Sequence, residues 1–230
     1  MSSSNTPLSL VALISGRGSN LGAIVHQCQQ HRIPAQISTV ISNNPDAPGL
    51  RIAQQAGIAT RVIDHREYAS RDEYDLALMK AIDETAPGLV VMAGFMRILS
   101  ADFVRHYAGR LINIHPSLLP DLRGLNTHAR ALAAGNKQHG ASVHFVTEDL
   151  DAGPLIIQAA VPVLKDDTPE SLAQRVLKQE HRIYPLAIAW FAQGKLQIHG
   201  DQVLLDGKQQ PEQGFGAAQK KAYSPQPLSS

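Results

Sequence analysis

Apolar residues gather in short runs along the first half of the chain, and segments with helical spacing separate these runs. Runs of about four to eight apolar or β-branched residues are typical of buried strands, whereas apolar residues at i, i+3, i+4 and i+7 indicate a helix with one buried face. We therefore expect strands at Leu8–Ile14, Ile37–Ile41, Ala59–Ile63, Leu89–Ala93 and Leu111–Ile114. Helices are expected around Leu21–Cys28, Ala47–Ala56, Arg71–Thr85 and, after Ser100 as N-cap, to Tyr107.

This alternation predicts an α/β fold, namely a Rossmann-like, mostly parallel sheet flanked by helices with right-handed crossovers. The alternation of strands and helices ends after Pro120. A short helix is expected at Thr127–Ala134, followed by two strand candidates joined by an acidic turn, Ser142–Thr147 and Leu155–Leu164. We expect these strands to extend the sheet as antiparallel additions in the C-terminal half.

A long helix is expected next, because Thr168 suits the N-cap position and Pro169 suits the first helical turn. Pro185 has no backbone N–H group, so we expect it to kink or break this helix after Tyr184.

The end of the chain is expected to form a hairpin followed by a tail. Two short strand candidates, Leu196–His199 and Val203–Leu205, predict a hairpin at the sheet edge. From about Pro211 the chain is rich in Gln, Pro, Ser and Lys, which predicts a disordered tail over residues 211–230. Residues 1–210 are then expected to form one domain.

Composition and residue spacing give no sign of a nucleic-acid-binding, metal-binding or membrane protein. The 21 Lys and Arg residues nearly balance the 20 Asp and Glu residues, so the net charge of +1 gives no sign of a nucleic-acid partner. None of the ten histidines has metal-site spacing such as HExxH, and the single Cys28 excludes an intramolecular disulfide and suits a reducing compartment. No apolar run approaches the roughly 20 residues of a membrane span, and Met1–Pro7 does not resemble a signal peptide. We expect a cytoplasmic monomer or homodimer that acts on small molecules, without nucleic-acid or membrane partners.

The loop Ser15–Asn20 lies between the first expected strand and the first expected helix. Its glycines let backbone N–H groups approach a ligand, and a helix N-terminus favours negative charge, so this order predicts an anion site. Leu21 takes the place of the third glycine of GxGxxG and no GK[ST] follows, so dinucleotide and P-loop binding fit poorly. We infer a site for one phosphate on a small substrate; the alternative is a plain turn with Ser19 or Asn20 as N-cap.

Asn113 and His115 stand two residues apart at the end of an expected strand. They therefore project to one face, at the place where open α/β sheets bind ligands. An amide donor beside an imidazole suits the stabilisation of an oxyanion during acyl transfer, although both side chains also suit simple hydrogen bonds to loop backbone. Asp149 and Asp151, in the later acidic turn, are either solvated or meet the end of this strand.

Two further features favour a ligand site. Glu180 falls at the edge of the apolar stripe of the long helix, where a carboxylate either binds something or lies at the rim. The apolar loop Gly94–Leu99 follows the carboxyl end of a strand, so it either walls a pocket for a flat ligand or packs into the core.

Several separated motifs together resemble the signature of the folate-dependent formyltransferases, from about residue 10 to residue 214. No single piece is specific, but the combination is. The motifs are Ile14–Leu21, Ala93–Leu99, Asn113–Pro120, Gly124, His139–Val146, Asp151–Pro154 and Ile157–Gln158.

The resemblance implies formyl transfer from 10-formyltetrahydrofolate, as co-substrate, to the amine of glycinamide ribonucleotide in purine synthesis, without a metal or a covalent enzyme intermediate. It places ribonucleotide binding in the N-terminal half, folate binding in the C-terminal half and catalysis between them. Asn113 matches the oxyanion donor, His115 the general acid and Asp151 the carboxylate that keeps His115 protonated. Gly18, Ser19, Asn20 and Glu180 match ribonucleotide contacts, and the folate contacts match Arg71, Met96, Arg97, Ile98, Leu99, Asn113, Thr147, Glu148, Asp149, Leu150 and Asp151.

The sequence departs from the family pattern at one place. Leu122 and Arg123 stand before Gly124, where an aromatic residue and a proline are expected, so the loop over the cleft is expected to differ in shape. Three alternatives carry other functions. They are a formyltetrahydrofolate hydrolase, a methionyl-tRNA formyltransferase and a non-catalytic nucleotide-binding module. The first two usually carry an added N-terminal or C-terminal domain, for which this chain offers no segment, and the third leaves Asn113 and His115 unexplained.

Overall fold

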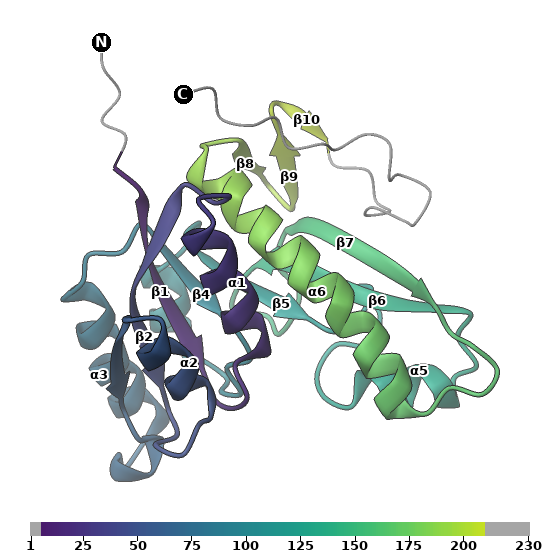
Figure 1. Ribbon diagram of the computed structural model, residues 1–230, viewed down its shortest axis with the longest axis horizontal. Helices are drawn as coiled ribbons and strands as arrows, with labels where there is room; N and C mark the ends of the chain where they lie inside the picture. The colour runs from purple at the N-terminus through teal and green to yellow at the C-terminus, as the bar shows by residue number, and fades with distance from the viewer. Residues whose placement is uncertain (1–5, 210–230) are drawn as a thin grey trace.

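The computed structural model describes residues 6–209 and contains a central seven-stranded sheet with strand order β3-β2-β1-β4-β5-β6-β7 (Figure 1). Strands β1 to β5 are parallel, and β6 and β7 are antiparallel to their neighbours. The expected α/β fold with antiparallel additions is therefore confirmed. The strands are β1 (Leu8–Ile14), β2 (Ala35–Ser42), β3 (Ala59–Val62), β4 (Leu89–Met92), β5 (Leu111–His115), β6 (Gln138–Phe145) and β7 (Leu155–Pro162).

Helices cover both faces of this sheet (Figure 1). Helices α1, α2 and α6 pack on one face, and α3 and α4 pack on the other. Alternate residues of each strand supply the two cores, so that on β4 Val91 faces α6 while Val90 faces α3. The helices are α1 (Ser19–Gln29), α2 (Gly49–Gln55), α3 (Arg71–Asp83), α4 (Ala101–His106), α5 (Thr127–Ala133) and α6 (Pro169–Ala192), with a 3₁₀ turn, η1, at His65–Glu67.

Helix α6 corrects one prediction, because it continues through Pro185 to Ala192 instead of breaking after Tyr184. Pro185 removes one helical hydrogen bond, but the helix residues before and after it are buried, and this packing holds the helix against the sheet. Tyr184 is fully buried, and its hydroxyl lies 3.1 Å from the carbonyl oxygens of both Met92 and Ile112. The capping prediction at the other end is confirmed, since Thr168 caps the helix.

Two strand predictions also need correction. Strand β6 begins four residues earlier than expected, at Gln138, and its residues from His139 to Phe145 are buried on both faces because β5 and β7 flank it. The expected hairpin forms, from β8 (Leu196–His199) and β9 (Gln202–Leu205), but it does not join the edge of the main sheet.

Instead, the hairpin pairs with β10 (Lys208–Gln209) in a separate three-stranded sheet. It packs beside β7 (Figure 1). Val203 of this hairpin belongs to the main core. Strand β10 is too short to show an apolar pattern and was not expected. The predicted tail at 211–230 lies outside the described residues. Within residues 6–209, no helix is long and apolar enough to cross a membrane.

Candidate active site

The glycine loop after β1 leaves the N-terminus of α1 open. Gly18, at the N-cap, has a left-handed φ of 73°, and a Cβ atom there would lie 2.6 Å from the Cα atom of Gly49. No side chain caps the helix, so the alternative that Ser19 or Asn20 acts as N-cap is wrong. The first N–H groups of α1 thus lack side-chain acceptors, which is the arrangement that favours an anion.

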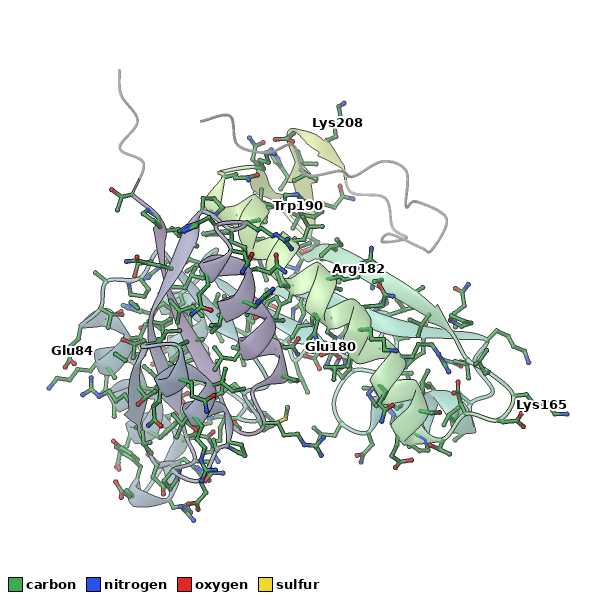
Figure 2. The ribbon with its side chains drawn as sticks, in the orientation of Figure 1. Glu84, Lys165, Glu180, Arg182, Trp190 and Lys208 are labelled. Atoms are coloured by element: carbon green, nitrogen blue, oxygen red, sulfur yellow. The ribbon has the colours of Figure 1, made fainter. Side chains whose placement is uncertain are left out.

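Asn20 on α1 and Glu180 on α6 meet although 160 residues separate them. The Nδ2 atom of Asn20 donates to Oε2 of Glu180 over 2.7 Å, and Figure 2 shows Glu180 where α6 passes α1. Both side chains are buried, and Oδ1 of Asn20 has no hydrogen-bond partner. Burial raises the pKa of Glu180, although the hydrogen bond from Asn20 opposes this rise. A polar pair of this kind, with an unused acceptor, suits a ligand that brings its own donors.

His115 lies at the end of β5 between two oxygen acceptors. Its Nδ1 atom is 3.4 Å from Oδ2 of Asp151, and its Nε2 atom is 3.0 Å from the carbonyl oxygen of Leu122. The side chains of His115 and Asp151 are only 7% and 8% exposed. An oxygen acceptor therefore faces each of the two ring nitrogens. Asp151 is itself fixed, since its Oδ2 atom accepts from the backbone N–H of Gly124 over 3.0 Å.

His144 completes this group and was not among the expected site residues. It lies on β6 directly opposite Asn113 on β5, so their side chains share one face. Nδ2 of Asn113 lies 3.4 Å from Nε2 of His144, which is also 3.8 Å from Oδ1 of Asp151. The sequence places a histidine on an alternating strand, but it contains no signal for the register that brings this residue to Asn113.

The loop after β4 presents apolar side chains to the outside. Met96 and Ile98 are 69% and 64% exposed, whereas Phe95 is buried. The alternative that this loop packs into the core therefore holds for Phe95 and, in part, for Leu99. The N–H of Met96 donates to Oγ of Ser15 over 2.8 Å, so the loop is tied to the glycine loop. Such exposed apolar groups on a fixed loop suit contact with a flat ligand.

The remaining expected folate contacts lie at the edges of this region. Arg71 is exposed at the start of α3, while the guanidinium of Arg97 lies over the Tyr74 ring and its buried Nε atom has no partner. On the opposite side, Glu148 is paired with Arg105 over 2.8 Å. Thr147, Asp149 and Leu150 are exposed in the same turn, and Leu99 is half-buried.

The structure thus brings the expected residues into two groups. Asn113, His115 and Asp151 form one group with His144, and Asn20 forms the other with Glu180. No hydrogen bond or ion pair among residues 6–209 joins the two groups directly. The same residues contain no cluster of three or more His, Cys, Asp or Glu side chains placed to hold a metal ion.

Comparison with known proteins shows which family and which solved structures this chain is similar to. Residues 8–188 match the family model described as formyl transferase. The chain is 53% identical to the phosphoribosylglycinamide formyltransferase of Escherichia coli over 210 residues, which cover 91% of this chain and 99% of that protein. It is 43% identical to the enzyme of the same name from Haemophilus influenzae, with coverage of 90% and 97%. The solved phosphoribosylglycinamide formyltransferase of Coxiella burnetii superimposes with a TM-score of 0.87 at 54% identity, covering 91% of this chain and 99% of that one.

Proposed function

This chain belongs to the formyl transferase family, and on that premise we propose that it is a phosphoribosylglycinamide formyltransferase of purine biosynthesis. It transfers the formyl group of 10-formyltetrahydrofolate to the amine of glycinamide ribonucleotide and releases tetrahydrofolate. The reaction takes place in the cytoplasm, between two small molecules and without a metal ion.

The transfer is a direct attack of the amine on the formyl carbon. As the nitrogen–carbon bond forms, the formyl oxygen becomes an oxyanion, and the amide N–H of Asn113 donates to it. The oxyanion then collapses, the bond between the formyl carbon and the folate nitrogen breaks, and His115 gives a proton to that nitrogen. The attacking nitrogen, which carries an extra proton after bond formation, gives that proton to His115 and so regenerates the acid. Asp151, 3.4 Å from Nδ1 of His115, holds the ring in place for these steps. These polar interactions gain strength because His115 and Asp151 are shielded from water.

The two substrates bind at the carboxyl ends of neighbouring strands. The substrate phosphate binds the N–H groups of the Gly18–Asn20 segment at the start of α1, and Glu180 contacts the hydroxyl or amine groups of the same molecule. The pterin lies against Met96 and Ile98, and the turn at 147–151 closes its other side. Arg71 and Arg97 lie where the folate's glutamate carboxylates extend.

One observation carries this proposal, namely the enclosure of His115 between Asp151 and the Leu122 carbonyl on the strand that also carries Asn113. A binding module has no need of a buried imidazole beside a carboxylate, whereas a proton donor beside an oxyanion site uses such a pair to hold its ring.

The test is a tetrahydrofolate-release assay by absorbance, run with and without glycinamide ribonucleotide. A transferase releases tetrahydrofolate only when the ribonucleotide is present, a hydrolase releases it in both cases, and a binding module in neither. His115→Ala should abolish turnover while ribonucleotide binding persists. The matched control is His199→Ala, at the exposed end of β8, which should leave turnover unchanged. Near-normal turnover of the His115 variant would contradict the acid assignment.

Binding of the substrate phosphate is tested separately. Asn20→Ala should raise the KM for the ribonucleotide more than it lowers kcat, because it acts on binding and not on the reacting atoms. An unchanged KM would place the phosphate site elsewhere.

A further inference from the structure

We propose that His144 is a positioning residue for the transfer: held through Nδ1 by the Phe145 carbonyl, it accepts a hydrogen bond at Nε2 from Asn113 and so turns the Asn113 amide N–H₂ group toward the reacting carbonyl. This inference rests on the proposed function and assigns a role to a residue that the acid–base scheme leaves unused.

The hydrogen bond at Nδ1 fixes the tautomer. Nδ1 of His144 lies 2.9 Å from the backbone carbonyl oxygen of Phe145. A carbonyl oxygen carries no proton, so the proton of this bond belongs to Nδ1. His144 is only 2% exposed, so bulk solvent has little access to that position.

The charge of the His144 ring decides whether Nε2 can accept a hydrogen bond. Burial lowers the pKa of His144 and the nearby His115 adds to this effect, while the Phe145 carbonyl and the Asp151 carboxylate oppose it. In the neutral ring with Nδ1 protonated, Nε2 bears a lone pair. That lone pair can accept from Nδ2 of Asn113, 3.4 Å away. Asp151 is the carboxylate nearest to Nε2, but at 3.8 Å it is too distant for a hydrogen bond.

The amide orientation of Asn113 follows from this lone pair. The terminal torsion of asparagine has two broad, nearly equivalent minima, so an unrestrained Asn113 would present either oxygen or nitrogen to the substrate. With its oxygen turned toward Nε2, two lone pairs would face each other. The orientation seen in the structure gives one amide proton to His144 and leaves the second proton for the oxyanion.

The strand register makes this contact specific. Asn113 and His144 are directly paired across β5 and β6, and His115 is paired with Ser142 in the same ladder. The next residues of β5 on the other face, Ile112 and Ile114, are fixed in the core under α6. His144 therefore cannot be replaced in this role by a neighbour without a change of register.

The first experiment needs no variant. Nitrogen NMR of the imidazole-labelled enzyme at neutral pH should show the His144 ring with Nδ1 protonated and Nε2 bare. A protonated Nε2 would overturn the proposal, because such a ring cannot accept from Asn113. This measurement is independent of turnover, so it remains decisive even if the proposed function fails.

The second experiment uses the tetrahydrofolate-release assay on a double-mutant cycle. His144→Leu should lower kcat toward the roughly 10²–10³-fold loss expected for removing an oxyanion donor outright, with little change in the ribonucleotide KM. In the Asn113→Ala background the same change should cost almost nothing, because the group it positions is already gone. Additive losses, or an unchanged kcat, would refute the role.

A conservative variant separates positioning from packing. His144→Gln keeps an acceptor near the position of Nε2 and should recover much of the activity that His144→Leu loses. If the leucine variant does not fold, the comparison of His144→Gln with the wild type still tests the role. A folded His144→Gln variant that is no more active than Asn113→Ala would contradict the positioning role of His144. Wild-type enzyme without any transferase activity would refute the proposed function instead.

Discussion

Replacing Gly153 by alanine tests how closely the turn that carries Asp151 must approach the end of β6. A Cβ atom on Gly153 would lie 1.9 Å from the carbonyl oxygen of Phe145. Non-bonded contacts of a Cβ atom below 3.0 Å are essentially never seen, so the two segments would have to separate by about 1 Å. The same carbonyl accepts from His144, so the displacement reaches both Asp151 and the ring that contacts Asn113.

The expected magnitude follows from this displacement. A misplacement of about 1 Å at a reacting group costs roughly 10²-fold in rate, and overpacking costs about 1–3 kcal/mol of stability. Gly153→Ala should therefore lower kcat about 10²-fold in the tetrahydrofolate-release assay and also lower Tm. The assay must be run well below the Tm of the variant, with folding verified by circular dichroism.

Gly22→Ala provides the matched control. Gly22 lies inside α1, and a Cβ atom there would meet only Ile52, at an ordinary 3.9 Å. Alanine inside a helix is favoured over glycine by roughly 0.5–1 kcal/mol, so this variant should be slightly more stable and fully active. If Gly153→Ala retains more than half of the wild-type kcat while folded, the turn is not held by this contact and the reasoning is wrong.

Two further predictions concern buried polar groups. Burial raises the pKa of Glu180, so the stability linked to this group is full below its ordinary pKa of about 4.3 and is lost as pH rises through the raised value. Glu180→Gln should thus raise the Tm of the ligand-free protein near neutral pH, and calorimetric scans should show this gain in Tm shrinking toward about pH 4. The variant should also raise the ribonucleotide KM. A gain in Tm that does not depend on pH would contradict the raised pKa of Glu180. Tyr184→Phe should lower the free energy of unfolding in urea by about 1–2 kcal/mol, because two carbonyls lose a donor, and should leave kcat unchanged.

Local patterns were enough to predict most of the fold. Leu8–Ile14 is apolar throughout because β1 is central and covered on both faces, and the structure has a strand with these bounds. The Thr168 cap is equally local, since a hydroxyl and the following proline define a helix start by themselves. These two predictions, which depend on one segment and its immediate flanks, were therefore confirmed.

Predictions that depend on a distant partner failed or could not be made. The effect of Pro185 was predicted from its missing N–H alone, whereas burial of the surrounding helix decided the outcome. The pairing of Asn20 with Glu180 spans 160 residues, and the pairing of Asn113 with His144 requires the β5–β6 register. Side-chain type indicates that a residue can take part in a site, but only the packed structure selects its partner.

The positions of Asn113 and His115 follow from the same alternation that forms the core. The glycine loop and the 94–99 loop follow β1 and β4, which are neighbours in the sheet although β2 and β3 lie between them in sequence, and such a switch point opens a crevice. On β5, Ile112 and Ile114 are buried under α6, so Asn113 and His115 must point to the opposite face. A shift of β5 by one residue would turn both isoleucines away from the core under α6 and place Asn113 and His115 in that apolar core instead. Hydrophobic burial thereby fixes the register on which Asn113, the proposed oxyanion donor, and His115, the proposed proton donor, depend, and formation of the proposed catalytic face is coupled to formation of the core.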